Sequence, residues 1–147
     1  MTTENVSSAG GNATYGFGTP VDLPFDQAIE RTKDALKAEG FGVLTTIDVQ
    51  QTLRDKLDVA FERYTILGAC NPQLAYRALT AEHDLGLLLP CNVIVYERGL
   101  GSVVSIVDPA QMLGFVGDNP ALLEVADETA TKLRRVIDAL ARPPAVR

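Results

Sequence analysis

The sequence predicts a single α+β domain, in which a mostly antiparallel open sheet is packed on one face by two long helices. Two amphipathic helical segments lie near the ends of the chain, over residues 25–40 and 119–141. Between them, segments rich in β-branched residues include a hairpin whose turn is Gly99-Leu100-Gly101. A hairpin requires antiparallel pairing, and helices with one apolar stripe suit a sheet that is covered on one side.

The length and composition are those of one globular domain. The chain has 147 residues, 46% of them apolar and 22% charged, which is enough to bury a core of its own. We expect residues 14–141 to form the domain, residues 1–13 a disordered lead and residues 142–147 a loose tail. No apolar run approaches the roughly 20 residues of a membrane helix. The first residues also lack the apolar segment of a secretory signal, so we expect a cytoplasmic protein with reduced cysteines.

The charge pattern argues against nucleic acid as a partner. There are 19 acidic and 13 basic residues, for a net charge of −6. The only basic cluster is Arg134-Arg135, near the end of the last expected helix, where it suits the helix dipole. Aromatic and basic residues do not alternate as they do in proteins that stack bases.

The first elements are a short strand, a long helix and a second strand. A strand is expected over about residues 14–19. Pro24 then predicts the start of a helix, since its missing N–H costs nothing there, and Gly40 predicts its left-handed end. Apolar residues recur at helical spacing between the two. Residues 41–47 then alternate in polarity, which predicts the next strand.

The middle of the chain repeats a cap followed by a helix. Asp48 predicts a short helix that ends at Leu57, with Leu53 and Leu57 pointing inward. The β-rich residues 61–69 follow. Asn71, followed by proline, is a good N-cap and predicts a helix to about residue 81.

The last part contains the hairpin and the second long helix. Pro90 cannot donate to a central ladder, so we place it at the mouth of a strand over residues 91–98. The returning strand is expected over residues 102–107, and a short helical or looped crossing over residues 109–115. Asn119, again followed by proline, predicts the start of the last helix.

Two short segments, Cys70-Asn71 and Cys91-Asn92, carry the side chains that most indicate a site. Each cysteine lies at a boundary of regular structure. Cys70 precedes an expected helix start, where the positive dipole end would favour a thiolate and lower the pKa of the cysteine. If the two strand ends are neighbours, a pocket closed by the last helix would form there. We expect it to be lined by Cys70, Asn71, Pro90, Cys91 and Asn92.

A structural interpretation of the same residues is equally open. Unpaired cysteine is often buried as a small apolar side chain, and Asn71 and Pro90 are explained by a helix cap and a strand entry. The cysteine spacing is not the two-residue gap of redox or zinc pairs. A closed zinc site needs four ligands, and the one histidine, His83, lies in an expected exposed turn. The sequence therefore names no metal and no cofactor.

No catalytic constellation stands out. The serines lack the context of a nucleophile elbow, and Gly16-Phe17-Gly18 lacks the third glycine or the Lys-Ser/Thr ending of a phosphate loop. The sequence leaves open whether the protein is an enzyme and favours a non-enzymatic domain.

Several segments also occur together in a recognisable order. They are Gly40-Phe41-Gly42-Val43, Leu67-Gly68-Ala69-Cys70-Asn71-Pro72, Leu88-Leu89-Pro90-Cys91-Asn92-Val93-Ile94-Val95-Tyr96-Glu97, and Asp108-Pro109 followed by Met112. In this order they resemble the bacterial family called domain of unknown function 302, over about residues 14–141. The resemblance implies a curved antiparallel sheet against helices and a homodimer. It implies no activity and no catalytic residues, but it makes both cysteine segments part of the family pattern.

Three functions follow as hypotheses. The first is a small-ligand-binding or interaction domain whose site lies at the strand ends that carry the two Cys-Asn segments. The second is a thiol-dependent redox, sulfur or soft-metal handling protein that uses Cys70 and Cys91. The third is a purely structural homodimerisation module, which would show a large apolar face and no pocket.

Overall fold

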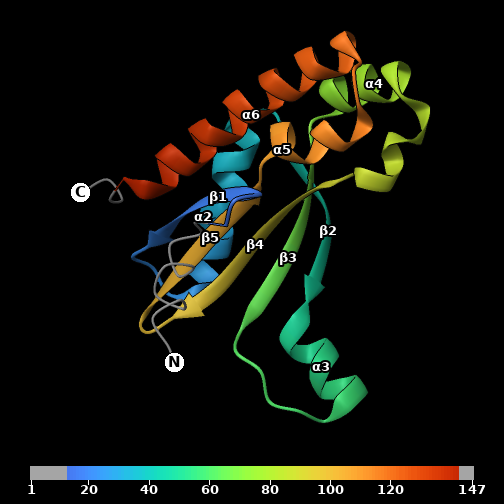
Figure 1. Ribbon diagram of the computed structural model, residues 1–147. Helices are drawn as coiled ribbons and strands as arrows, with labels where there is room; N and C mark the ends of the chain where they lie inside the picture. The colour runs from blue at the N-terminus through green and yellow to red at the C-terminus, as the bar shows by residue number, and fades with distance from the viewer. Residues whose placement is uncertain (1–12, 143–147) are drawn as a thin grey trace.

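A five-stranded antiparallel sheet forms the centre of the structure, a computed structural model that describes residues 13–142 (Figure 1). The spatial order is β1-β5-β4-β3-β2. The strands are β1 (Gly16–Val21), β2 (Gly42–Asp48), β3 (Tyr64–Cys70), β4 (Cys91–Arg98) and β5 (Gly101–Val107). The predicted α+β class and antiparallel sheet are confirmed. The expected lead and tail fall almost wholly outside the described residues and stay predictions.

Two long helices pack against each other and against the sheet. They are α2 (Phe25–Ala38) and α6 (Pro120–Ala141), and both contribute to one continuous apolar core. The shorter elements are α3 (Val49–Leu57), α4 (Pro72–Ala81), η1 (His83–Leu88), α5 (Pro109–Leu113) and η2 (Gly114–Val116). Within residues 13–142, no helix is both long and apolar enough to span a membrane.

The strand register decides which side chains face the helices. Leu67 of β3 lies opposite Val93 of β4, and Ala69 lies opposite Cys91; all four are buried. Successive strand side chains point to opposite faces, so Asn92, between two of these residues, points to the face that the long helices do not cover. Asn92 is accordingly exposed.

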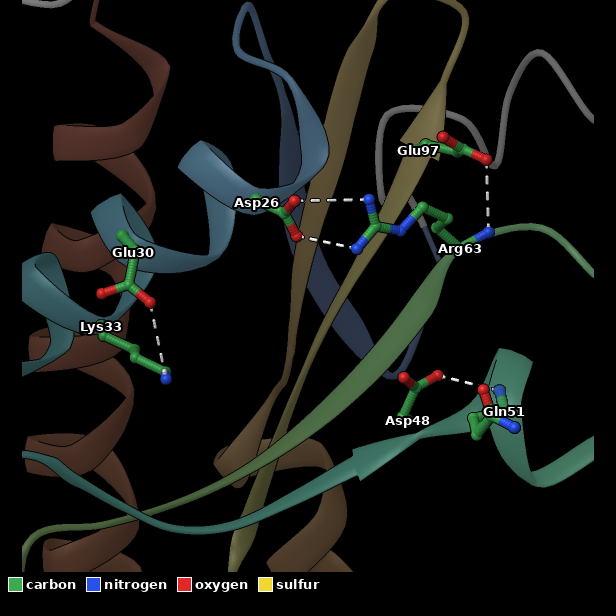
Figure 2. Close-up of polar contacts among 7 residues, drawn as sticks. All are labelled: Asp26, Glu30, Lys33, Asp48, Gln51, Arg63 and Glu97. Carbon is green, nitrogen blue, oxygen red and sulfur yellow. Dashed lines mark hydrogen bonds and ion pairs between the residues drawn. The ribbon is translucent and has the colours of Figure 1, made fainter.

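Three side-chain caps begin helices where the sequence predicts them. Asp48, Asn71 and Asn119 each accept a hydrogen bond from the backbone N–H three residues later, at 2.9, 3.2 and 3.2 Å. Figure 2 shows this bond for Asp48 and Gln51. At the other end of α2, Gly40 adopts a φ of 86°, a left-handed conformation that glycine adopts without strain. Local sequence therefore sets the helix starts.

An ion pair joins the start of β3 to the first turn of α2. The two terminal nitrogens of Arg63 lie 2.7 and 3.4 Å from the carboxylate oxygens of Asp26 (Figure 2). The guanidinium also lies 4.4 Å from the centre of the Phe25 ring. On the other side, the backbone N–H of Arg63 donates to Glu97 of β4 at 3.3 Å. Arg63 thus connects three elements at the end of the sheet that lies away from α4.

The prediction that α3 points Leu57 inward is wrong, and Leu53 is only half-buried. No residue of α3 is buried, and Leu57 is 64% exposed. Figure 1 shows α3 at the far end of β2, projecting away from the two long helices. The apolar spacing of this helix is real, but its contacts with β2 and β3 bury none of its residues fully.

Candidate functional site

An apolar cavity of about 300 Å³ lies on the helix-covered side of the sheet, where β3 ends and β4 begins. Helices α4, α5 and α6 gather above these strand ends (Figure 1). Each of these helices and η1 contributes to the lining. The apolar lining includes Phe41, Leu74, Ala78, Leu85, Met112 and Val125. Among residues 13–142, no Lys, Arg, Asp, Glu or His side chain lines this cavity.

Both cysteines line this cavity as thiols. Cys91 is the first residue of β4 and is 7% exposed, while Cys70 is the last residue of β3 and is half-buried. In the β3–β4 register Cys91 lies opposite Ala69, the neighbour of Cys70 in the chain. Two segments far apart in the sequence are therefore brought together at one strand end.

Burial raises the pKa of both thiols. Removal from water raises the pKa of Cys91 to about 11, and the nearby Cys70 adds to the rise because two thiolates repel each other. Burial also raises the pKa of Cys70. The lowered pKa expected for Cys70 from its position before α4 is therefore wrong. Both sulfurs are neutral thiols at pH 7.

Asn71 lines the cavity, but both ends of its amide are engaged. Its Oδ1 caps α4 through the N–H of Leu74 at 3.2 Å, and its Nδ2 donates to the carbonyl oxygen of Glu39 at 3.4 Å. Glu39 is the last residue before Gly40, so Asn71 ties the end of α2 to the start of α4. The side chain positions the cavity wall and has little capacity left for a ligand.

Pro90 lies at the entry to β4, preceded by a cis peptide bond from Leu89. A Cβ placed on Gly68 of β3 would lie 2.8 Å from the Cγ of the Pro90 ring. The absence of a side chain at Gly68 therefore lets the proline pack directly on β3. Pro90 itself lines the cavity, next to Cys91.

The structure places Asn92 outside the cavity. Because strand side chains alternate, Asn92 points to the opposite face of the sheet from Cys91. There it lines a separate groove together with Tyr64, Tyr96 and Arg98. Four of the five predicted site residues thus meet at one cavity, and Asn92 does not.

Sequence reasoning missed most of the cavity wall. Leu85, Met112 and Thr129 line it from η1, α5 and α6. The hydroxyl of Thr129 donates to the carbonyl oxygen of Val125 at 2.7 Å, so it too is engaged. The one signal in the sequence for this wall was the run of leucines that begins at Leu85. These leucines precede the predicted strand, so they have to pack against another part of the protein.

Within residues 13–142, no group of three or more His, Cys, Asp or Glu side chains is arranged to hold an ion. His83 is exposed at the start of η1 and does not line the cavity.

Comparison with known proteins places this geometry in a family. The family model described as "Domain of unknown function DUF302" matches residues 17–140. The chain belongs to this family. The resemblance drawn from the cysteine segments and their neighbours is thereby confirmed. No curated protein matches the sequence.

A solved structure of a DUF302 protein has the same fold. It is the crystal structure of an uncharacterised conserved protein from Bacillus stearothermophilus, with a TM-score of 0.80 and 32% sequence identity. The match covers 87% of this chain and 99% of the other. The fold is therefore shared with a second DUF302 protein of known structure.

Proposed function

We propose that this domain binds a small, uncharged and largely apolar ligand in the cavity beside Cys70 and Cys91. The observation that carries the proposal is the apolar cavity at the point where the two cysteine segments meet. Its volume of about 300 Å³ lies at the lower end of the range found for small-molecule sites, roughly 300–1,000 Å³. A small ring system fits such a space.

The lining selects against charge. A charged group moved into an apolar cavity loses its hydration, and no described charged side chain lines the wall to compensate. The amide of Asn71 and the hydroxyl of Thr129 already have partners. The remaining polar groups are two neutral thiols, which are weak donors and polarisable surfaces. The ligand is therefore apolar, with at most one weakly polar group.

A fluorescence titration tests this proposal. The neutral dye N-phenyl-1-naphthylamine would bind the wild-type protein with a rise in emission. Ala78 of α4 lines the cavity and is 4% exposed, so Ala78→Leu fills part of the space and weakens dye binding. Ala121→Leu, at an exposed position of α6, is the matched control and binds the dye as the wild type does. Equal binding by both variants, or no binding by the wild type, would contradict the proposal.

A thiol-dependent activity is the second candidate, because two thiols converge on one cavity. Its requirement is a reactive thiolate near neutral pH, and burial raises the pKa of both cysteines instead. The rate of alkylation by iodoacetamide against pH separates the two candidates. The binding proposal expects slow alkylation at pH 7 that rises above pH 9, whereas fast alkylation at pH 7 supports thiol chemistry.

The remaining expectations stay predictions. A purely structural module would have no pocket, and the cavity favours ligand binding over that alternative. A homodimer and a cytoplasmic location remain to be measured. Native mass spectrometry of the protein purified from its own cells would report a retained ligand and the number of subunits together.

A further inference from the structure

The cavity beside the two cysteines opens to solvent through an apolar mouth. Most of the described residues that line the cavity are buried or half-buried, and three are exposed: Leu44 of β2, Leu79 of α4 and Gly86 of η1. Leu44 is 67% exposed and Leu79 is 37% exposed. These three residues define the mouth, and none of them has a polar side chain.

A β-bulge holds Leu44 at the mouth. The β2–β3 register shifts between Val43 and Thr45, so Leu44 has no partner on β3. A bulge re-aims a side chain and often lies beside a site. Because Leu44 borders the cavity and is still largely exposed, a ligand that reaches the mouth buries apolar surface that the folded chain leaves in water.

Gly86 keeps the mouth open on the side of η1. A Cβ built on Gly86 meets no described atom within 4 Å. Leu85, the residue before it, lines the cavity and is 2% exposed, whereas Leu87, the residue after it, is 87% exposed. Apolar side chains therefore continue from the cavity, past the mouth, to the outer surface of η1.

The charges that lie nearest to the mouth in the chain are negative. Asp84 lies two residues before Gly86 in η1, and Glu82 directly precedes η1. Residues 82–88 include no Lys or Arg. An anionic group at the mouth would be repelled there, whereas an uncharged polar group would not. Inside the cavity, Asn71 and Thr129 already have partners, so a polar head group keeps its hydration only outside.

We propose that the ligand is a single-chain amphiphile with an uncharged head group. Its chain fills the cavity and passes through the mouth over Leu44 and Leu79, and its head group stays in water. This inference rests on the proposed function and adds the class of the ligand and its orientation. A compact ligand that ended inside the cavity would leave the mouth exposed, whereas a chain that continues outward covers it. Each methylene that is buried in this way raises the affinity by about fourfold.

Isothermal titration calorimetry with alkyl maltosides, kept below their critical micelle concentrations, tests the proposal. The maltose head group is uncharged and too polar for the cavity, so such a molecule binds only if its chain passes through the mouth. The affinity is expected to rise by about tenfold from octyl maltoside to decyl maltoside. Equal affinities, or no binding of either maltoside while N-phenyl-1-naphthylamine binds, would overturn this inference and leave the proposed function standing. If neither the dye nor a maltoside binds, the proposed function fails as well.

Substitutions at the mouth test where the chain passes. Leu44→Ser removes apolar contact and weakens the binding of decyl maltoside by about fivefold. Leu57→Ser is the matched control and leaves the binding unchanged, because Leu57 is 64% exposed in α3 and does not line the cavity. Gly86→Asp serves if Leu44→Ser does not fold: its side chain has open space, and its carboxylate at the mouth weakens the binding by about tenfold. Mouth variants that bind decyl maltoside as the control does would overturn the proposal.

The charge of the head group has a separate test. Decanoate has an anionic head group, which would lie near Asp84 when the chain is in the cavity. Asp84→Asn should therefore tighten the binding of decanoate by about threefold and leave that of decyl maltoside unchanged. A decanoate affinity that does not respond to Asp84→Asn would overturn the selection of an uncharged head group.

Discussion

Alkaline pH should destabilise this protein in part through one buried thiol. Cys91 is 7% exposed, at the start of a central strand. Burial, with the nearby Cys70, raises its pKa from 9.0 to about 11. The folded protein therefore holds the proton of Cys91 over a pH range in which the unfolded chain releases it. Folding becomes less favourable in that range.

The sign and size follow from proton linkage. Because the folded pKa is raised, the contribution of Cys91 is fully present below about pH 9 and is lost as the pH rises through 11. A rise from 9.0 to about 11 corresponds to about 3 kcal/mol, at 1.36 kcal/mol for each tenfold change. The free energy of unfolding should therefore fall by up to about 3 kcal/mol on this account. Such a fall is a large share of the stability of one domain.

Urea unfolding at pH 8 and pH 11, in reducing buffer, measures this loss. Other groups titrate in this range as well, so the informative quantity is the difference between the wild type and Cys91→Ala. Cys91→Ala should lose about 2 kcal/mol less than the wild type between the two pH values, because at pH 11 the folded thiol is only about half ionised. Cys70→Ala is the control and should keep most of the loss, because Cys70 is only half-buried. An equal loss in Cys91→Ala and wild type would refute the assignment to Cys91.

Three further substitutions test the frame around the cavity. Asn71→Ala removes the cap of α4 and the bond to the Glu39 carbonyl, and should lower the free energy of unfolding in urea by about 1–2 kcal/mol; an unchanged value would mean that water replaces the cap. Gly40→Ala forces a φ of 86° on alanine and places its Cβ 2.9 Å from the Asn71 Nδ2, so the melting temperature of this variant should fall. Gly86→Ala is the control: a Cβ there meets open space, so this variant should melt near the wild-type temperature. Arg63→Ala should lower the free energy of unfolding by less than about 1 kcal/mol, and by less still in high salt, because the ion pair with Asp26 is partly exposed. A loss of stability that does not depend on salt would instead indicate lost packing on Phe25.

Local signals predicted most of the secondary structure. The strand β4 begins at Cys91 and ends at Arg98, as predicted. Pro90 limits the strand at its start, and the turn at Gly99 limits it at its end. The caps at Asp48 and Asn71 act over three residues and needed no tertiary knowledge. In contrast, the sequence predicts no element over residues 83–88, where the structure has η1, because this short helix depends on packing against α4.

The sequence predicted in part which residues meet at the cavity, and the errors have a physical cause. Cys70 and Cys91 meet because β3 and β4 pair in a register that brings their ends together. Asn92 points away from the cavity because successive side chains of a strand point to opposite faces. Its position could therefore be predicted once Cys91 was known to face the core. Leu57 was expected inside because helical spacing reports that a helix has an apolar face, and not whether another element covers it.

The sequence by itself determined where most of the helices and strands begin, since caps, prolines and turn glycines act within a few residues. It also determined that the two cysteine segments lie at strand ends. Only the tertiary structure decided that these strand ends line a cavity to which no charged side chain of the described residues contributes. It also decided that the pKa of both thiols is raised, so that they are neutral. Cavity walls and pKa values depend on residues remote in the chain, and on how completely these residues exclude water. No local pattern records that exclusion.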